Sequence, residues 1–431
     1  MRNLIDLQRT ERAYLVGIES RSHQAWESED SIKELIRLTD TAGAEVVGSM
    51  IVRIKMLNPA YYIGQGKISE IAQICTLENI NVIIFDVNLS PAQVKNIQAL
   101  CPELRIIDRT QLILDIFARR ARTTEAQLEI EFVQLEYLLP RLTGQWTHLS
   151  RQVGGIGTRG PGETQLEVDR RRVMSRIITL KKELNRLQTS RTVQRKKRLL
   201  QHIPLAAIIG YTNAGKTTLF NWISGSQNFT EDRLFATLDT TVRQIDLENS
   251  KKILVADTVG FLQRLPHNLI ASFKTTLDEV RDADLLIHVI DISDPLYQER
   301  MESVHTVLQE MEVEKPMILV FNKVDLLDNL SVIDSLLRKS TNAVAVSAKA
   351  ERGLEALHQL IDQFLCEGLS VYYFFIPHQA QDSLTYVYRS GRVLHKSYDA
   401  DGVNMKIEMD PRFIYPIKKY LVNHPAEGSP E

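Results

Sequence analysis

The sequence predicts an α/β protein in three parts: an N-terminal α/β domain with a long helical hairpin, a central domain with a mixed, mostly parallel sheet, and a small C-terminal α+β appendage. Strand-like and helix-like segments alternate along the first 143 residues, and a strand, a glycine-rich loop and a helix follow one another from residue 203. Such alternation is typical of parallel sheets covered by helices. A long stretch of helical periodicity separates these two regions. We place the boundaries at residues 1–143, 144–201, 202–368 and 369–431.

Length and composition indicate a soluble protein of several domains. The 431 residues allow two to four domains, and 44% hydrophobic and 25% charged residues are ordinary values. With a net charge of −2, any nucleic-acid-binding surface must be local. The N-terminus resembles no signal peptide, and no apolar run approaches the ~20 residues of a membrane span. We expect a cytosolic monomer without stable membrane insertion.

The N-terminal region alternates regularly. Its elements are expected as strands at 14–18, 46–54, 82–85 and 105–107 and as helices at 31–38, 68–77, 91–100, 110–122 and 125–142. Pro91 after Ser90 suits a first helical residue behind a serine cap, and Thr124 is the expected cap of the last helix. The GQGK of residues 64–67 predicts a turn into a helix. Widely spaced Cys75, Cys101 and Cys366 predict buried, reduced thiols.

A glycine-rich loop and a basic helix follow. Residues 154–162 hold five glycines and a proline, which excludes regular structure; the loop is either a hinge or a contact surface, and Arg159 favours contact with an anion. The periodicity of residues 165–200 predicts one helix. Its apolar stripe should pack against a second helix, for which we expect residues 125–142. The stripe consists of Leu166, Val173, Ile177, Leu180, Leu184 and Leu187. Residues 170–198 carry twelve cations and one acid, Glu183. Nucleic-acid phosphate is the expected partner of that face.

Residues 210–217 (GYTNAGKT) lie between an apolar strand, residues 203–209, and an apolar-periodic helix. This spacing is that of a phosphate-binding loop, in which glycines let backbone N–H groups surround the phosphates. Lys216 can reach the β- and γ-phosphates, and the Thr217 hydroxyl can bind Mg²⁺.

Two later motifs select guanine. Residues 322–325 (NKVD) follow a strand at 317–321, and the Asp325 carboxylate can accept two hydrogen bonds that guanine offers and adenine lacks. Lys323 can lie along the base. Residues 347–349 (SAK), after a strand at 343–346, supply an N–H for the guanine O6.

Residues 257–260 (DTVG), after a strand at 253–256, complete the predicted site. Asp257 would hold Mg²⁺ through water, and the Gly260 N–H would touch the γ-phosphate. A threonine in the preceding loop should complete the metal shell, and spacing leaves Thr237, Thr240 and Thr241 open. The predicted nucleotide contacts are Gly210, Tyr211, Thr212, Asn213, Ala214, Gly215, Lys216, Thr217, Thr218, Phe235, Ala236, Thr237, Leu238, Asp239, Asp257, Thr258, Val259, Gly260, Asn322, Lys323, Val324, Asp325, Ser347, Ala348 and Lys349.

One position departs from many switch GTPases. The residue after Gly260 is Phe261, where those proteins place a glutamine that orients the attacking water. Because a phenyl ring cannot do this, we expect slow intrinsic hydrolysis and a stimulating partner. In the appendage we expect a strand at 371–376, a helix at 380–394, a hairpin at 395–409 turning near 399–402, and a short helix near 413–421, followed by a disordered tail.

These motifs together resemble the HflX GTPases, relatives of the Obg group. The resemblance covers roughly residues 10–368 and is carried by residues 62–67, 107–111, 114–123, the glycine loop, QLEVDRRR at 165–172, GYTNAGKT, LFATLD at 234–239 and the phenylalanine after DTVG. It implies a GTP hydrolase that uses Mg²⁺, binds the large ribosomal subunit and splits stalled or idle ribosomes, notably under heat stress. It also implies that the N-terminal module reaches ribosomal RNA through the Arg159 loop and residues 170–198.

On the family pattern, Thr237 is the switch threonine and acts in catalysis with Lys216 and Gly260. The chain departs in having Thr240 where many members have proline. Asp325 gives no support to ATP as a second substrate. Two alternatives remain: a switch acting on a protein or membrane surface, and an RNA-binding chaperone or helicase. The basic helix disfavours the membrane, because residues 165–200 contain no aromatic residue to face acyl chains.

Overall fold

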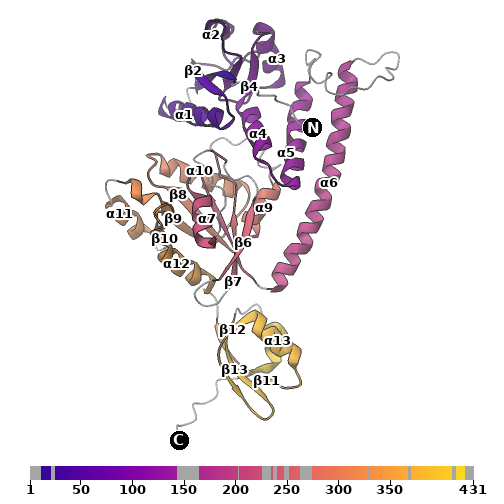
Figure 1. Cartoon of the computed structure of the whole chain (residues 1–431), viewed down its shortest axis with the longest axis vertical. Coiled ribbons are helices and arrows are strands. Elements are labelled where there is room, and N and C mark those ends of the chain that lie inside the picture. The colour runs from indigo at the N-terminus through magenta and orange to yellow at the C-terminus, as the bar shows by residue number, and fades with distance from the viewer. Residues whose placement is uncertain are drawn as a thin grey trace.

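The computed structural model describes residues 11–20, 25–142, 165–201, 203–225, 234–235, 240–246, 252–262, 274–327, 331–340, 342–366, 370–409 and 414–422. Within them the chain forms three sheets, one in each region of the α/β architecture expected from the sequence. The regions follow one another along the longest axis of the molecule, with the two helices of the hairpin alongside (Figure 1).

The N-terminal sheet is parallel, as predicted. Its strands β1 (Arg12–Ser20), β2 (Glu45–Ile54), β3 (Val82–Phe85) and β4 (Arg105–Asp108) lie in the order β2-β1-β3-β4. Successive side chains of β1 enter opposite cores, because a strand points alternate residues to opposite faces: Leu15 packs in one core and Val16 in the other. The sheet is therefore buried on both faces.

Four helices cover this sheet. Helices α1 (Ala25–Thr41) and α4 (Arg109–Arg120) fill the core that contains Leu15, and α2 (Gln65–Leu77) and α3 (Pro91–Leu100) fill the other. The predicted cap of α3 is confirmed: the Ser90 hydroxyl accepts from the Gln93 N–H at 3.2 Å, and the Gln93 side chain accepts from the Ser90 N–H at 2.8 Å. Helix α2 begins at the predicted turn.

Helix α5 (Thr124–Leu138) corrects two expectations. Its cap is Thr123 and not Thr124, because Thr123 is extended and its side chain accepts from the Ala126 N–H at 3.2 Å. The helix also ends earlier than residue 142. A 3₁₀ turn, Leu139–Arg141, replaces its predicted last turn, since Pro140 has no N–H to continue the α-helical pattern.

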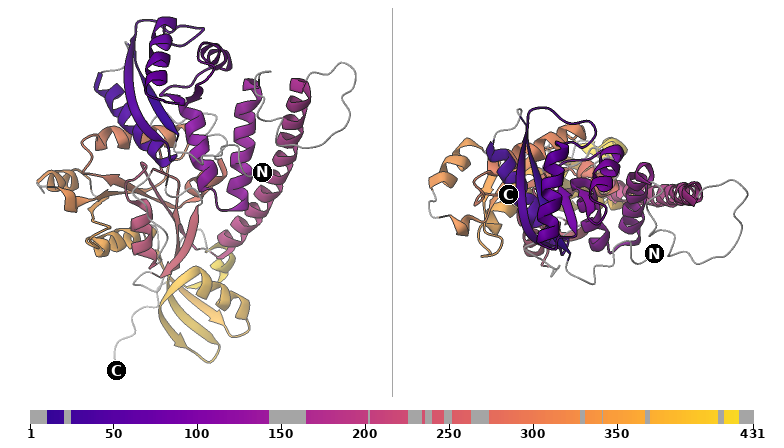
Figure 2. Two further views of the ribbon diagram at one scale, coloured as in Figure 1. Left: turned by 45° about the horizontal axis from the view of Figure 1, so that its top comes forward. Right: turned by 90° about the horizontal axis from the view of Figure 1, so that it is seen from above.

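Helix α6 (Gln165–Gln201) runs beside α5, as predicted (Figures 1 and 2). The structure describes the side chains of this helix from Glu167 to Thr189, except that of Gln188. In that span the predicted stripe is buried or half-buried, and Arg176 forms a two-point ion pair with Glu131 of α5, at 2.9 and 2.7 Å. Leu166 and the side chains of residues 190–200 lie outside the described part.

The central sheet has the order β10-β9-β8-β5-β7-β6. Strands β5 (Leu205–Gly210), β7 (Lys252–Asp257), β8 (Leu285–Asp291), β9 (Met317–Asn322) and β10 (Ala343–Ala345) are parallel, and β6 (Thr241–Asp246) is antiparallel to β7. Helices α7 (Lys216–Ser224), α9 (Lys274–Asp282), α10 (Tyr297–Glu310), α11 (Ser331–Lys339) and α12 (Leu354–Cys366) surround it. The sheet is mixed and mostly parallel, as expected.

In its described residues, the C-terminal part is an antiparallel sheet with one α-helix. Strands β11 (Ser370–Pro377), β12 (Gly391–Tyr398), β13 (Gly402–Met409) and β14 (Leu421–Val422) accompany α13 (Gln381–Ser390). The helix ends before residue 394, because the chain becomes extended at Gly391, where a Cβ would lie 2.5 Å from Ile407. The predicted hairpin is confirmed. The short helix is a 3₁₀ helix, Tyr415–Tyr420, and the tail lies outside the described residues.

The N-terminal and central domains share a core. Three residues of the central domain pack among buried residues of the N-terminal domain: Leu234, Phe235 and Leu262. The Phe235 ring packs edge-on against the Phe117 ring, with 4.5 Å between the ring centroids. Phe235 is itself a predicted nucleotide contact, Leu234 precedes it, and Leu262 follows two residues after Gly260. Segments next to the predicted nucleotide contacts therefore pack directly against the N-terminal domain.

Two smaller expectations concern the thiols and the membrane. Cys75 and Cys101 are free and buried, as predicted, and burial raises the pKa of both; the Cys366 side chain lies outside the described part. Of the helices whose residues are described, none is long and apolar enough to cross a bilayer.

Candidate nucleotide-binding site

The phosphate loop connects β5 to α7 and is shaped by close contacts. Gly215 has φ +94°, and a Cβ there would lie 2.2 Å from Asn322 Nδ2, so this position requires glycine. The Lys216 ammonium is buried and donates to the Tyr211 carbonyl at 2.8 Å. Burial lowers the pKa of Lys216 to about 8, against the opposing effect of Asp257. A bound anion would stabilise the charged ammonium and so offset the effect of burial, as expected at a phosphate site.

Two oxygen groups meet where Mg²⁺ was expected. The Thr217 hydroxyl donates to Asp257 Oδ2 at 2.8 Å, and Asp257 is buried at the end of β7. Hydroxyl and carboxylate oxygens are the ligands Mg²⁺ prefers, so these residues fit the ion. Thr258 is turned away: its hydroxyl donates to the Ile208 carbonyl at 2.6 Å inside the sheet. Only its backbone can face a nucleotide.

Asn322 joins three of the predicted motifs. Its Nδ2 donates to the Ala214 carbonyl in the phosphate loop at 2.9 Å, and its Oδ1 accepts from the Ala348 N–H at 3.0 Å. The side chain is buried. Asn322 therefore holds the two loops predicted to contact guanine against the phosphate loop.

The predicted guanine contacts lie together, with Asp325 and Lys349 exposed and Ser347 and Ala348 buried. Asp325 is exposed and accepts a hydrogen bond from the Ser347 hydroxyl, which also accepts from the Ala350 N–H at 3.1 Å. Lys323 has φ +64°, and its ammonium pairs with Asp291 at 2.7 Å. The exposed Lys349 follows Ala348.

The loop before β6 is only partly described. Residues 236–239, which include Thr237, lie outside the described part, so the metal and catalytic role of Thr237 stays a prediction. Thr241 begins β6 and pairs with Asp257 across the strands. The Phe235 side chain, which was expected at the nucleotide, packs in the shared core instead.

Phe261 is buried and holds the loop by its backbone. Its N–H donates to the Gly210 carbonyl at 3.0 Å, and its carbonyl accepts from the Thr212 N–H at 2.8 Å. Phe261 is 2% exposed, and its ring packs in a core that includes residues of α9 and α10. It therefore does not face the nucleotide.

Gly260 leaves room for the lysine beside it. A Cβ at this position would lie 2.8 Å from Thr212 Cα and 2.9 Å from Lys216 Nζ. We expect Gly260→Ala to displace Lys216 and lower GTP turnover by at least about tenfold, the effect of ~1.4 kcal/mol in the barrier. Gly66→Ala, where no atom lies within 4 Å of the added methyl, is the matched control. Equal turnover by the two variants would contradict this role.

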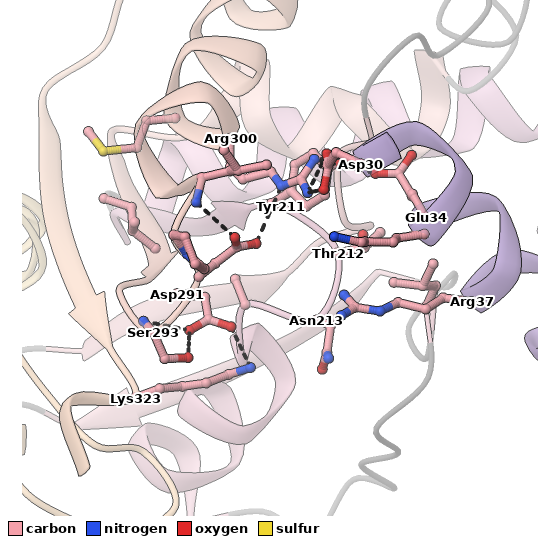
Figure 3. A pocket seen from close by; sticks show the side chains of 18 of the residues that line it. Asp30, Glu34, Arg37, Tyr211, Thr212, Asn213, Asp291, Ser293, Arg300 and Lys323 are labelled. Carbon is pink, nitrogen blue, oxygen red and sulfur yellow. Dashed lines mark hydrogen bonds and ion pairs between the residues drawn. The ribbon is translucent and has the colours of Figure 1, made fainter. Parts of the chain in front are cut away.

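A cavity of about 900 Å³ lies between α1 and the phosphate loop. Its walls include Arg37 of α1, which extends towards Asn213, and the ion pair of Lys323 with Asp291 (Figure 3). Sequence motifs gave no sign of this wall. Its residues Asp30 and Glu34 lie far along the chain from the loop they face.

His288 lies in the wall of the same cavity and is almost fully buried. Burial lowers the pKa of His288 to about 3. Lys216 and His305, whose ring centroid lies 5.6 Å from that of His288, lower this pKa further. The unfolded chain therefore takes up a proton as the pH falls below 6.5, whereas the folded chain does not until about pH 3, so stability falls with pH over that range. Between pH 7 and 5 we expect a loss of about 2 kcal/mol from this group.

Replacing His288 with phenylalanine removes this titration. In urea unfolding, the variant should lose about 2 kcal/mol less than the unmodified chain between pH 7 and 5. Equal losses in the two chains would contradict the assignment.

Comparison with known proteins agrees with this geometry. Residues 29–118 match the family model "GTP-binding GTPase N-terminal", residues 120–198 match "GTP-binding GTPase Middle Region", and residues 205–323 match "50S ribosome-binding GTPase". The chain is 41% identical over 414 residues to "GTPase HflX" of Caldanaerobacter subterraneus subsp. tengcongensis, with 96% of this chain and 94% of the relative covered. It is 42% identical over 383 residues to "GTPase HflX" of Escherichia coli, with 88% and 90% covered.

Among solved structures, a GTP-binding protein from Sulfolobus solfataricus in complex with GDP aligns at 26% identity and a TM-score of 0.43, covering 83% of this chain and 99% of that one. The identity to the two curated relatives extends over both the nucleotide domain and the N-terminal domain with its hairpin. The resemblance noted in the motifs is thereby confirmed: the chain belongs to the HflX family of GTPases and is a GTP hydrolase.

Proposed function

We propose that the GTP-bound protein binds the large ribosomal subunit and separates stalled or idle ribosomes, and that hydrolysis of GTP resets it. It would act as a monomer in the cytoplasm, where ribosomes are found. The match of residues 205–323 to the model for 50S ribosome-binding GTPases supports the partner. The curated relatives are named as GTPases of this family.

The observation that carries the proposal is the basic face of α6. Arg170, Lys181 and Lys182 are exposed on this helix, while its apolar stripe is covered by α5. Like charges at this density weaken a helix, and a polyanion such as ribosomal RNA would compensate them. The Arg159 loop lies outside the described residues, so its contact with RNA stays a prediction.

The nucleotide site supports slow hydrolysis that a partner accelerates. Thr217, Asp257 through water and Thr237 would hold Mg²⁺, which neutralises charge on the β- and γ-phosphates. The buried Phe261 side chain offers no group to orient a water molecule. We infer that the ribosome orders the loop around Thr237 and so completes the site.

The proposal is tested by reversing charge on α6. The triple variant Arg170→Glu/Lys181→Glu/Lys182→Glu should lose sedimentation with large subunits and lose their stimulation of GTP turnover, while turnover without ribosomes is kept. Lys55→Glu/Lys95→Glu, two exposed lysines elsewhere in the N-terminal domain, is the control.

Unchanged binding by the α6 variant would contradict RNA recognition through this helix. Binding to free RNA without any preference for large subunits would favour the RNA-chaperone alternative. Binding to anionic vesicles alone would favour the membrane switch.

A further inference from the structure

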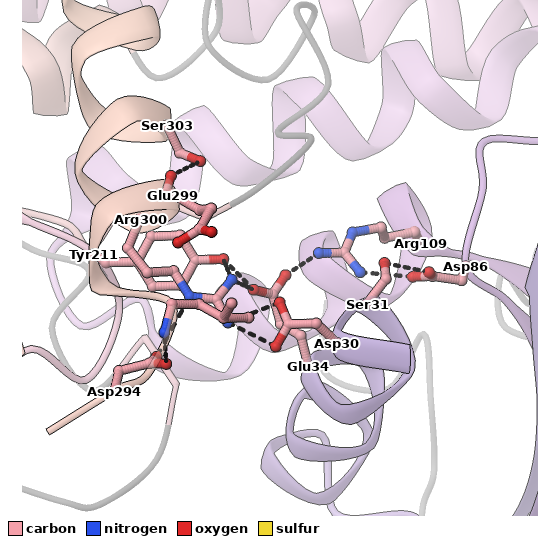
Figure 4. A network of polar contacts seen from close by, with 11 residues as sticks. Asp30, Ser31, Glu34, Asp86, Arg109, Tyr211, Asp294, Glu299, Arg300 and Ser303 are labelled. Atoms are coloured by element: carbon pink, nitrogen blue, oxygen red, sulfur yellow. Dashed lines mark hydrogen bonds and ion pairs between the residues drawn. The ribbon is translucent and has the colours of Figure 1, made fainter. Parts of the chain in front are cut away.

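The side chain of Tyr211 leaves the phosphate loop and enters the interface with the N-terminal domain. Its hydroxyl donates to Glu34 Oε2 of α1. Arg300 of α10 lies over its ring, 4.6 Å from the centroid, and donates to the hydroxyl at 3.2 Å (Figure 4). Arg300 also pairs with Asp30 of α1 at 2.8 Å. The second residue of the phosphate loop is thus held by both domains.

Glu34 is itself held firmly from the N-terminal side. It is buried, and its other oxygen pairs with the buried Arg109 at the start of α4. Arg109 pairs in turn with Asp86 at 2.7 Å, and Asp86 accepts from the Ser31 hydroxyl. Burial alone would lower the pKa of Arg109, but Glu34 and Asp86 outweigh it and raise that pKa. The network is therefore connected and largely buried, which strengthens each hydrogen bond in it.

The backbone of Tyr211 meets the lysine of the site. The Tyr211 carbonyl accepts from the Lys216 ammonium at 2.8 Å. The same residue therefore binds the N-terminal domain by its side chain and Lys216 by its main chain. The anchored side chain therefore limits how far the Tyr211 main chain, and with it the carbonyl, can move.

From this geometry we propose that Glu34 is a positioning residue for GTP hydrolysis. Through the Tyr211 hydroxyl it fixes the phosphate loop, and with it the ammonium of Lys216, in the geometry that stabilises charge on the transferring phosphate. Docking of the N-terminal domain thereby sets the competence of the site. This role requires only the GTPase activity and is independent of any ribosomal partner.

Charge on the phosphate oxygens is redistributed in the transition state, where pre-positioned cations matter most. Loosening Lys216 should therefore slow hydrolysis more than it weakens binding of GDP. In Tyr211→Phe and in Glu34→Gln, we expect the single-turnover rate of the full-length chain to fall about tenfold, with GDP affinity within about twofold of the unmodified chain. The double variant should be no slower than the slower single variant, because both changes break one link.

The chain offers a matched control in Tyr137 of α5. Its hydroxyl donates to the buried Asp108, and Arg141 lies over its ring, 3.5 Å from the centroid. This trio repeats the chemistry of Tyr211, Glu34 and Arg300 but contains no residue of the phosphate loop. Tyr137→Phe should therefore destabilise folding about as much as Tyr211→Phe, yet keep the hydrolysis rate.

Three results would overturn the proposal. The first is an unchanged rate in Tyr211→Phe or Glu34→Gln. The second is an equal loss of rate in Tyr211→Phe and Tyr137→Phe, which would indicate general destabilisation. The third is a double variant in which the two losses multiply, because the residues would then act independently. Large-subunit stimulation is not part of the assay, so a failure here is distinct from a failure of ribosome binding.

Discussion

Asp325→Asn is expected to lower the affinity for GTP by at least about 10²-fold and to raise that for xanthosine triphosphate. The carboxylate accepts from two guanine N–H groups in the predicted contact, and an amide places a donor against one of them. Xanthine presents a carbonyl at that position and so suits the amide. Competition between the two nucleotides for the full-length chain measures the change.

The structure supplies the control for this substitution. Asp334→Asn alters another exposed aspartate in the same domain, on α11, and should leave both affinities unchanged. Ser347→Ala, which removes the hydroxyl that donates to Asp325, should cause a smaller loss in the same direction. If Asp325→Asn binds GTP as the unmodified chain does, the guanine assignment is wrong.

Arg109→Ala is expected to destabilise the N-terminal domain by about 3–5 kcal/mol. Arg109 is 2% exposed and pairs with both Glu34 and Asp86, so its removal leaves the buried Asp86 without this cation and leaves Glu34 with the more distant Arg300, at 3.6 Å. Urea unfolding followed by hydrogen exchange of the β1 and β3 amides locates the loss.

An exposed ion pair of the same domain is the control for this substitution. Arg53→Ala, which breaks the exposed ion pair with Glu19, should change stability by at most about 1 kcal/mol. Equal losses in the two variants would contradict the importance of the buried network.

The sequence was most informative where a constraint is local. Gly215 and Lys216 belong to a loop whose spacing is dictated by backbone contacts, and the Ser90–Gln93 capping box needs only four residues. The alternating segments likewise sufficed for the N-terminal sheet. Adjacent threonines were harder, because Thr123 and Thr124 have the same capping chemistry and only the backbone conformation distinguishes them.

Contacts between distant segments could not be predicted. Tyr211 and Glu34 lie 177 residues apart, and Arg300 and Asp30 lie 270 apart, so no periodicity relates them. Phe235 illustrates the same difficulty. Its place in the motif predicted a nucleotide contact, whereas its ring is drawn into the N-terminal core by Phe117. Motifs identify the chemistry of a site, but the relative position of two domains decides which side chains face it.

Light scattering of intact ribosomes tests the proposed function most directly. The chain bound to a non-hydrolysable GTP analogue should lower the scattering as subunits separate, while the GDP-bound chain should leave it unchanged. This result would mean that binding of the GTP form, rather than hydrolysis, drives separation. Scattering that stays constant with both nucleotides, at concentrations where the chain sediments with large subunits, would contradict ribosome splitting.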